Sequence, residues 1–150
     1  MRRMANGTAV ACDGKAVLIL GEPGVGKSDL ALRLIDEGAL LIADDLVELT
    51  RGGDQVMAAF PSDAPAELRG RIEAWGIGIL SVPAVDRPVV LALVVEATAP
   101  AQVPRMPKAE YSQWLEIDVP TLRLALLEPS TPTKVRLALG AISGSIIRPS

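Results

Sequence analysis

Residues 16–45 read AVLILGEPGVGKSDLALRLIDEGALLIADD, and the order of patterns within this stretch predicts the fold. The apolar run 16–20 is typical of a buried strand, and the Gly- and Pro-rich segment 21–26 that follows does not continue it. From Lys27 the apolar residues recur at the spacing of an amphipathic helix, and Gly38 stands where such a helix commonly ends. The stretch therefore predicts a strand, a loop and a helix in immediate succession.

The loop between this strand and helix matches the pattern G-x-x-x-x-G-K-S of phosphate-binding loops. Its glycines let backbone N–H groups surround an anion, and the unpaired amides at the helix start face the same anion. Lys27 supplies a charge for the β- and γ-phosphates, and the Ser28 hydroxyl is a ligand for Mg²⁺. If the segment were only a glycine-rich turn that caps the helix, the spacing of its glycines relative to Lys27 and Ser28 would have no explanation. The predicted nucleotide-binding residues are Gly21, Glu22, Pro23, Gly24, Val25, Gly26, Lys27, Ser28 and Asp29.

A second apolar run, 39–43, predicts another buried strand, which ends in the pair Asp44 and Asp45. Adjacent carboxylates at a buried strand end are costly unless a cation lies near them. Alone, such a pair is as often a helix cap or a turn. If this strand lies beside the strand that precedes the phosphate loop, the pair faces the loop. One carboxylate could then hold Mg²⁺ while the other accepts a hydroxyl proton.

A further carboxylate, Glu73, lies in the segment 68–82, which three glycines interrupt. Such glycines indicate strands that are broken by close backbone approaches. Arg69 and Arg71 flank Glu73, so the spacing fits an exposed, ion-paired residue as well as a functional carboxylate.

Composition limits the chemistry that is possible. The chain has 150 residues, a formal net charge of -3, no histidine and one cysteine, Cys12. This length predicts one domain, 1–150, and the charge argues against nucleic acid as a partner. Histidine triads, histidine zinc sites and thiolate metal sites are excluded. Any catalysis must therefore use carboxylates, Lys, Arg, hydroxyls and backbone amides.

Hydropathy is high, with 49% apolar residues and a mean hydropathy of +0.34. The most apolar stretch, 88–99, is shorter than the roughly 20 residues that a membrane-spanning helix needs. The N-terminus lacks the apolar region of a signal peptide, so we expect a cytoplasmic protein without a membrane segment. The apolar residues suit strands buried on both faces, or a buried oligomer interface.

The rest of the chain contains additional strand patterns. The run 8–12 and the turn at Asp13-Gly14 predict a hairpin into the strand 16–20. The segment 46–50 is expected to extend the strand 39–43 or to pair with it, and 56–60 is a short strand or a loop. Strands are expected at 89–96 and 113–119, with a proline-rich loop at 98–107. A helix is expected at 133–142, with Val135, Leu137, Ala138 and Ala141 on its apolar face.

Three segments resemble one known family. The run 18–45 joins the phosphate loop, one helix and Ala-Asp-Asp as in the catalytic domain of HPr kinase/phosphorylase. Residues 73–79 match a second motif of that family, Glu-x-x-Gly-x-Gly-Ile, and 133–136 are similar to its C-terminal helix. The resemblance covers most of the chain and is to the short form, which lacks the N-terminal domain of longer members.

The resemblance implies a single-domain α/β fold with a phosphate loop in a mixed twisted sheet, similar to phosphoenolpyruvate carboxykinase. It implies a protein-serine kinase that uses ATP and Mg²⁺ to phosphorylate the phosphocarrier HPr. Many members also catalyse phosphorolysis of phosphoserine-HPr, and longer members are hexamers, so a homo-oligomer is expected.

The resemblance also implies roles for individual residues. Asp44 would be the general base, and Asp45 and Lys27 complete the predicted catalytic set. Ser28, Glu73 and Asp45 would hold Mg²⁺. Arg105 would lie in a loop that contacts HPr.

Two positions depart from the family pattern. Asn6 stands where the family has a histidine, and Trp75 stands where the second motif has an arginine. These changes bear on the reverse reaction and on the identity of the target. They leave two alternatives open: a nucleotide-binding regulatory protein with weakened or lost transferase activity, and a small-molecule kinase that uses Arg69, Arg71 and Arg105.

Overall fold

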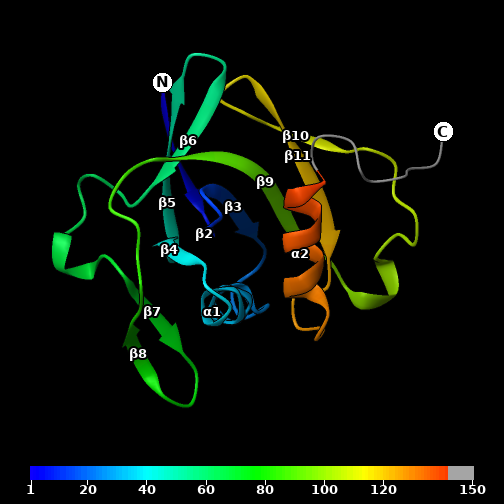
Figure 1. The fold of residues 1–150 in the computed structure, drawn as a ribbon, viewed down its shortest axis with the longest axis horizontal. Helices are drawn as coiled ribbons and strands as arrows, with labels where there is room; N and C mark the ends of the chain where they lie inside the picture. The colour runs from blue at the N-terminus through cyan, green and yellow to red at the C-terminus, as the bar shows by residue number, and fades with distance from the viewer. Residues whose placement is uncertain (142–150) are drawn as a thin grey trace.

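A curved mixed sheet of nine strands dominates the computed structural model, which describes residues 1–141 (Figure 1). Its strands are β1 (Arg2–Asn6), β2 (Thr8–Cys12), β3 (Lys15–Leu20), β4 (Leu40–Ala43), β5 (Leu46–Gly52), β6 (Gln55–Ala59), β9 (Val89–Ala97), β10 (Tyr111–Trp114) and β11 (Ile117–Leu124). A separate hairpin consists of β7 (Arg71–Ala74) and β8 (Gly78–Ser81). The helices within this part of the chain are α1 (Lys27–Asp36), α2 (Thr131–Gly140) and two short 3₁₀ turns, Ala66–Leu68 and Pro100–Gln102. The expected α/β class is confirmed.

Strand β9 organises the sheet. It pairs in parallel with β3 along one edge, while β6 and then β11 pair with successive parts of β9. Strand β2 lies antiparallel between β3 and β4, so β4 runs in the same direction as β3. The carboxyl ends of β3, β4, β9 and β11 therefore open at one edge of the sheet, where α/β proteins usually bind ligands.

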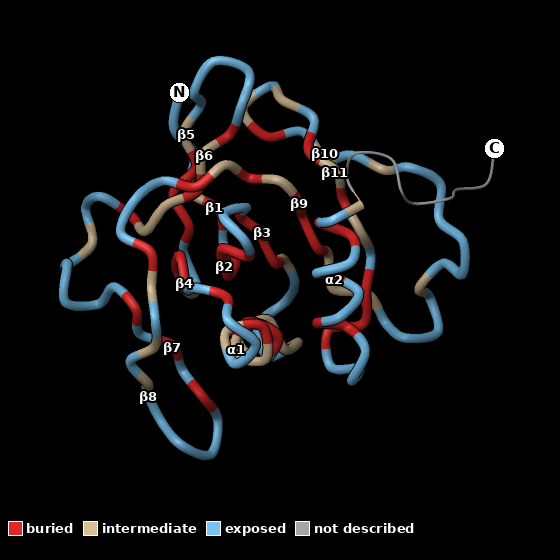
Figure 2. The backbone as a smooth tube through the Cα atoms, in the orientation of Figure 1, coloured by how far each residue is buried: buried red, intermediate tan, exposed pale blue. Residues whose placement is uncertain are grey.

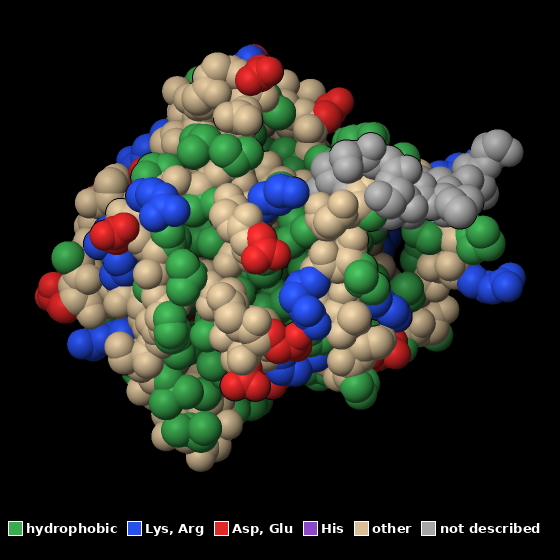
Figure 3. Space-filling model, viewed as in Figure 1, with side chains coloured by type: hydrophobic (Ala, Val, Ile, Leu, Met, Phe, Trp, Pro, Cys, Tyr) green, Lys and Arg blue, Asp and Glu red, His purple; other side chains and the backbone are tan. Residues whose placement is uncertain are grey.

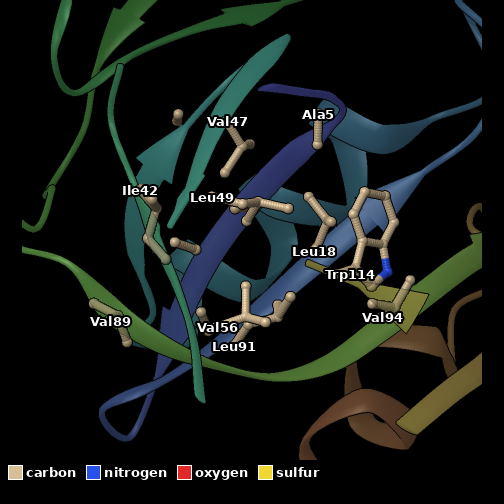
Figure 4. Close-up of a cluster of buried hydrophobic side chains, with 14 of the residues drawn as sticks. Ala5, Leu18, Ile42, Val47, Leu49, Val56, Val89, Leu91, Val94 and Trp114 are labelled. Carbon is tan, nitrogen blue, oxygen red and sulfur yellow. The ribbon is translucent and has the colours of Figure 1, made fainter. Parts of the chain in front are cut away.

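Strands β2 and β3 are buried on both faces, as their uninterrupted apolar runs predict (Figure 2). On one face, Leu18 of β3 packs with Val47 and Leu49 of β5 and with Trp114 of β10 (Figure 4). On the other face, Ile19 joins a second cluster that includes residues of α1 and α2. The curled sheet thus encloses one core, and the two helices cover the other.

Helix α1 follows the predicted amphipathic pattern, with Leu30 and Leu34 fully buried against the sheet. It ends in a Schellman motif, in which Ala39 N–H donates to the Leu34 carbonyl and Gly38 N–H donates to the Ile35 carbonyl. Gly38 has a φ of 109°, a conformation that glycine adopts without strain. This turn sends the chain directly back into β4.

Two of the sequence-based predictions in the C-terminal half are wrong in detail. The stretch 113–119 is a hairpin, because the chain turns at Leu115 and Glu116, whose φ angles are 51° and 68°. Two consecutive non-glycine residues with positive φ give no turn signal in the sequence. The last helix begins at Thr131, and Leu137 is 68% exposed. The predicted end of this helix at Ile142 lies outside the described residues.

The N-terminal strand β1 was not predicted. It pairs along its whole length with β5.

The glycines of the segment 68–82 serve different purposes. Gly70 lies close to the Val82 carbonyl, as expected, whereas Gly76 and Gly78 have no such neighbour and belong to the end of the β7–β8 hairpin. Within residues 1–141, no helix has the length and hydropathy needed to cross a lipid bilayer.

Glu48 of β5 connects this strand to β1 and to the loop after β6. Its Oε1 accepts hydrogen bonds from Arg2 Nε at 3.1 Å and from Ser62 N and Oγ at 3.1 and 2.8 Å. The hydrogen bond from the Ser62 backbone N–H is the main cause that lowers the pKa of Glu48 from its ordinary value. Because the folded-state pKa is lowered, the stabilisation is complete above the carboxylate's ordinary pKa and is lost as the pH falls through the folded value.

We expect Glu48→Gln to lower the free energy of unfolding by about 1–2 kcal/mol at pH 7, since it weakens charge-assisted hydrogen bonds. Urea unfolding at pH 7 and at pH 3 measures this difference, which should shrink at pH 3, because that pH lies below the ordinary pKa of a glutamate carboxyl group. Glu67→Gln, an exposed position, is the control and should change little at either pH. A loss of equal size at both pH values would contradict the charge-based explanation.

Candidate functional site

The predicted phosphate loop joins β3 to α1 at the edge of the sheet where the parallel strands end. Gly24 and Gly26 have φ angles of 81° and 111°, which side-chain-bearing residues rarely adopt. Gly26 is the N-cap of α1 and provides no side-chain cap, so the first amides of the helix lack a side-chain acceptor. Such amides, at the positive end of the helix dipole, favour an anion.

Lys27 lies over this loop. Its Nζ donates a hydrogen bond of 2.5 Å to the Gly21 carbonyl, across the span of the loop. The Lys27 ammonium and the uncapped amides of α1 together concentrate positive charge at one place. This arrangement suits a phosphate chain.

Asp44 forms the centre of a small hydrogen-bond network beside the loop. Its Oδ1 accepts one hydrogen bond from Ser28 Oγ and one from Thr8 Oγ1, both at 2.8 Å. These three side chains come from the end of β4, the first turn of α1 and the start of β2. The carboxylate is thus held in position next to the residue that follows Lys27.

The route by which Asp44 reaches the loop differs from the expected one. Strand β4 does not lie beside β3, because β2 is inserted between them. Asp44 still meets Ser28, since β4 and β3 run in the same direction and end at the same edge. Thr8 on the inserted strand then supplies a second hydroxyl, which the sequence analysis missed.

Asp45 follows Asp44 directly in the sequence, but the two residues differ in backbone conformation and in burial. The φ of Asp45 is 70°, and Leu46 N–H donates a hydrogen bond of 2.9 Å to the Asp44 carbonyl. This hydrogen bond closes a γ-turn centred on Asp45. The Asp45 carbonyl also accepts a hydrogen bond of 3.1 Å from Gly7 N–H. The turn leaves Asp45 exposed while Asp44 is half-buried.

Asn6 lies close to this turn. It is the last residue of β1 and pairs in register with Leu46, which follows Asp45. The departure from the resembled family at this position therefore falls beside the carboxylate pair. Thr8, whose hydroxyl donates to Asp44, stands two residues after Asn6.

The remaining predicted residues, Glu73 and Arg105, are exposed. Glu73 is exposed on β7, whose neighbours Ile72 and Ala74 are buried, so Glu73 faces away from the core. The hairpin also exposes Trp75, at 84%, together with Ile77 and Ile79. Figure 3 shows hydrophobic side chains gathered at the lower left, where this hairpin lies. Arg105 is exposed in the loop after β9. Among the described residues, Glu73 and Asp45 make no side-chain hydrogen bond to Ser28, and no group of three or more acidic or cysteine side chains is arranged as a metal site.

Gly7 allows β1 and β2 to approach this site closely. A Cβ at this position would lie 2.6 Å from the Ile19 carbonyl oxygen, which belongs to the backbone of β3. We expect Gly7→Ala to lower the free energy of unfolding by about 2 kcal/mol or more, because the backbone must shift. Thermal unfolding measures this loss. Gly140→Ala is the control, because the added methyl group meets no atom of the described residues beyond its own helix, and equal stabilities of the two variants would contradict the expectation.

Comparison with known proteins gives a consistent result. The family model described as HPr Serine kinase C-terminal domain matches residues 1–130. The HPr kinase/phosphorylase of Caldicellulosiruptor bescii is 46% identical over 77 residues, which are 51% of this chain and 24% of that protein. The HPr kinase/phosphorylase of Bordetella pertussis is 38% identical over 109 residues, which are 67% of this chain and 34% of that protein. The chain thus spans about a quarter to a third of these relatives' length.

A solved structure extends the similarity to the whole fold. The HPr(Ser) kinase/phosphatase of Coxiella burnetii superimposes with a TM-score of 0.80 at 30% sequence identity. The match covers 95% of this chain and 99% of that chain. The curved mixed sheet and its helices are therefore shared with that protein.

Proposed function

Because the chain belongs to the HPr serine kinase C-terminal domain family, we propose that it is an ATP- and Mg²⁺-dependent protein-serine kinase that acts on the phosphocarrier HPr. One observation carries this proposal. The carboxylate of Asp44 is held by Ser28 and Thr8 directly beside a phosphate loop, within one site. A carboxylate next to transferable phosphate is what a hydroxyl acceptor requires.

The loop fits the phosphates of a nucleotide. Uncapped amides at the start of α1 and the ammonium of Lys27 supply the positive charge that a triphosphate needs. The neighbouring donor set consists of hydroxyl and carboxylate oxygens, which are the ligands that Mg²⁺ prefers. We propose that Ser28, Asp45 and Glu73 hold the metal ion, which would neutralise charge on the β- and γ-phosphates.

The reaction assigns a distinct role to each side chain. Asp44 accepts the hydroxyl proton of the substrate serine while the serine oxygen bonds to the γ-phosphorus of ATP. The bond between the γ-phosphorus and the oxygen that bridges to the β-phosphate breaks. The products are phosphoserine and ADP. Lys27 stabilises the negative charge on the transferring phosphoryl group. Ser28 and Thr8 fix the carboxylate in place by donating to the same oxygen of Asp44.

The partner, the reverse reaction and the assembly belong to the same proposal. HPr is the expected substrate in the cytoplasm, with Arg105 in a contacting loop and a hexamer as the assembly. We propose that phosphorolysis of phosphoserine-HPr is weak, because Asn6 beside the carboxylate turn cannot titrate as the family's histidine does. The same substitution and Trp75 support the second candidate, a nucleotide-binding regulatory protein without transferase activity.

Incubation with ATP, Mg²⁺ and the HPr of the same organism tests the proposal, with phosphoserine detected by mass spectrometry. A second reaction contains phosphoserine-HPr and excess inorganic phosphate. Phosphoserine in the first reaction supports the kinase. Tight ATP binding without transfer to HPr from either ATP or pyrophosphate would exclude the kinase and favour the regulatory protein. ADP formed only with a small metabolite would indicate a small-molecule kinase.

A further inference from the structure

Leu127 is an exposed leucine at the rim of the phosphate loop. It follows β11, and its side chain is 63% exposed although Ala125 and Leu126 before it are buried. Single exposed leucines are ordinary on protein surfaces, so exposure alone has no meaning. The position of this one, against the loop that would hold phosphate, is the reason to consider it.

Leu127 contacts the loop at Gly26. A Cβ on Gly26 would lie 2.6 Å from Leu127 Cδ2 and 3.0 Å from Leu127 Cγ. The leucine side chain therefore occupies the space directly above the glycine that precedes Lys27. Any molecule whose phosphates lie in the loop must extend past this rim or into solvent.

Arg33 fixes the backbone on both sides of Leu127. Its guanidinium donates to the Leu126 carbonyl and, at 3.0 Å, to the Glu128 carbonyl, while its Nε donates to Asp29 Oδ2 at 3.0 Å. Arg33 belongs to α1, the helix that begins at the loop. The segment with Leu127 and the phosphate loop are thus attached to the same helix, which keeps their spacing constant.

The topology decides which way a nucleotide would run. Asp44 lies on the β4 side of the loop, and as the proposed base it must face the γ-phosphate and the substrate hydroxyl. Leu127 lies on the opposite side, where β9 and β11 end next to the loop. With the terminal phosphate toward Asp44, the ribose and base extend toward Leu127.

We infer that Leu127 forms the surface on which the nucleobase lies, and that Arg33 is the residue that positions it; this inference rests on the proposed nucleotide site. The leucine offers an apolar face to the flat ring. Within the described residues, the backbone N–H and C=O of Leu127 make no hydrogen bond, so one donor and one acceptor can meet the edge of the base. An area this small does not suit a protein partner, for which several hundred square ångströms are needed.

Binding of two ligands by calorimetry separates the base from the phosphates. The ligands are ATP and inorganic tripolyphosphate, each with Mg²⁺, and the variants are Leu127→Ala and the control Leu137→Ala. Leu137 is similarly exposed but lies on α2, and among the described residues it is not a neighbour of the loop glycines. We expect Leu127→Ala to weaken ATP binding about five- to tenfold, with tripolyphosphate affinity unchanged within about twofold. The control should alter neither affinity.

The other possible outcomes of this titration contradict either the role of Leu127 or the proposed function. Equal weakening of both ligands would mean that Leu127 supports the loop and does not contact the base. Unchanged ATP affinity, or wild-type protein that binds tripolyphosphate as tightly as ATP, would exclude the base surface while leaving the phosphate site intact. If wild-type protein binds neither ligand, the proposed function itself fails, and the inference fails with it.

Discussion

Asp44→Asn should greatly slow phosphoryl transfer while the protein still binds nucleotide. The amide keeps the size of the carboxylate but cannot accept the serine proton, so we expect the transfer rate to fall by a factor on the order of 10² or more. The hydroxyls of Ser28 and Thr8 can still donate to the amide oxygen, which preserves the local geometry. Single-turnover transfer to HPr and calorimetric titration with ATP measure the two properties separately.

Asp54→Asn is the matched control for this variant. Asp54 is exposed in the turn between β5 and β6, neither of which pairs with β3, the strand that leads into the loop, and its replacement should leave transfer unchanged. Transfer by Asp44→Asn at the wild-type rate would show that Asp44 is not the base. Loss of both transfer and ATP binding would instead assign Asp44 to ligand binding.

Lys27→Met should weaken both nucleotide binding and transfer. Methionine keeps the unbranched stem but removes the charge over the loop, together with the hydrogen bond to the Gly21 carbonyl. We expect ATP affinity to fall about tenfold or more and transfer to fall by a factor on the order of 10³, because the charge acts most strongly on the transferring phosphoryl group. Titration with ATP and with tripolyphosphate should show the same loss, since the proposed site places the lysine against the phosphates and not against the base.

The control for the lysine is Lys15→Met. Lys15 is exposed at the start of β3, at the opposite end of the strand from the loop. Its replacement removes the same charge from the molecule and should change neither affinity. If both variants lose affinity equally, the effect is a general one of net charge, and the specific role of Lys27 is excluded.

The parts of the fold that follow from local sequence were predicted correctly. The strand, loop and helix at 16–38 are consecutive, so turn chemistry and periodicity suffice to identify them. β1 was missed because its exposed residues have little apolar pattern and its pairing with β5 is a long-range contact. The turn at Leu115 and Glu116 was missed because tertiary context imposes positive φ on residues that do not favour it.

The candidate site was only partly predictable for the same reason. The loop residues and Asp44 stand in a recognisable motif, but their meeting depends on where β2 inserts in the sheet. Thr8 and Asp44 are 36 residues apart, and nothing local to either residue indicates their hydrogen bond. Leu127 and Gly26 are separated by a far longer stretch, so only the folded chain reveals their contact.

The shared strand β9 has a consequence for how the protein folds. β6 and β11 pair with different parts of β9, and β3 pairs with it along the other edge, so none of these strands has its full set of neighbours before β9 is present. The phosphate loop is synthesised well before residue 89, where β9 begins. Non-local pairings of this kind slow folding. We therefore expect the loop, although it is the earliest recognisable motif, to acquire its rigid form late, after the C-terminal half has been added to the sheet.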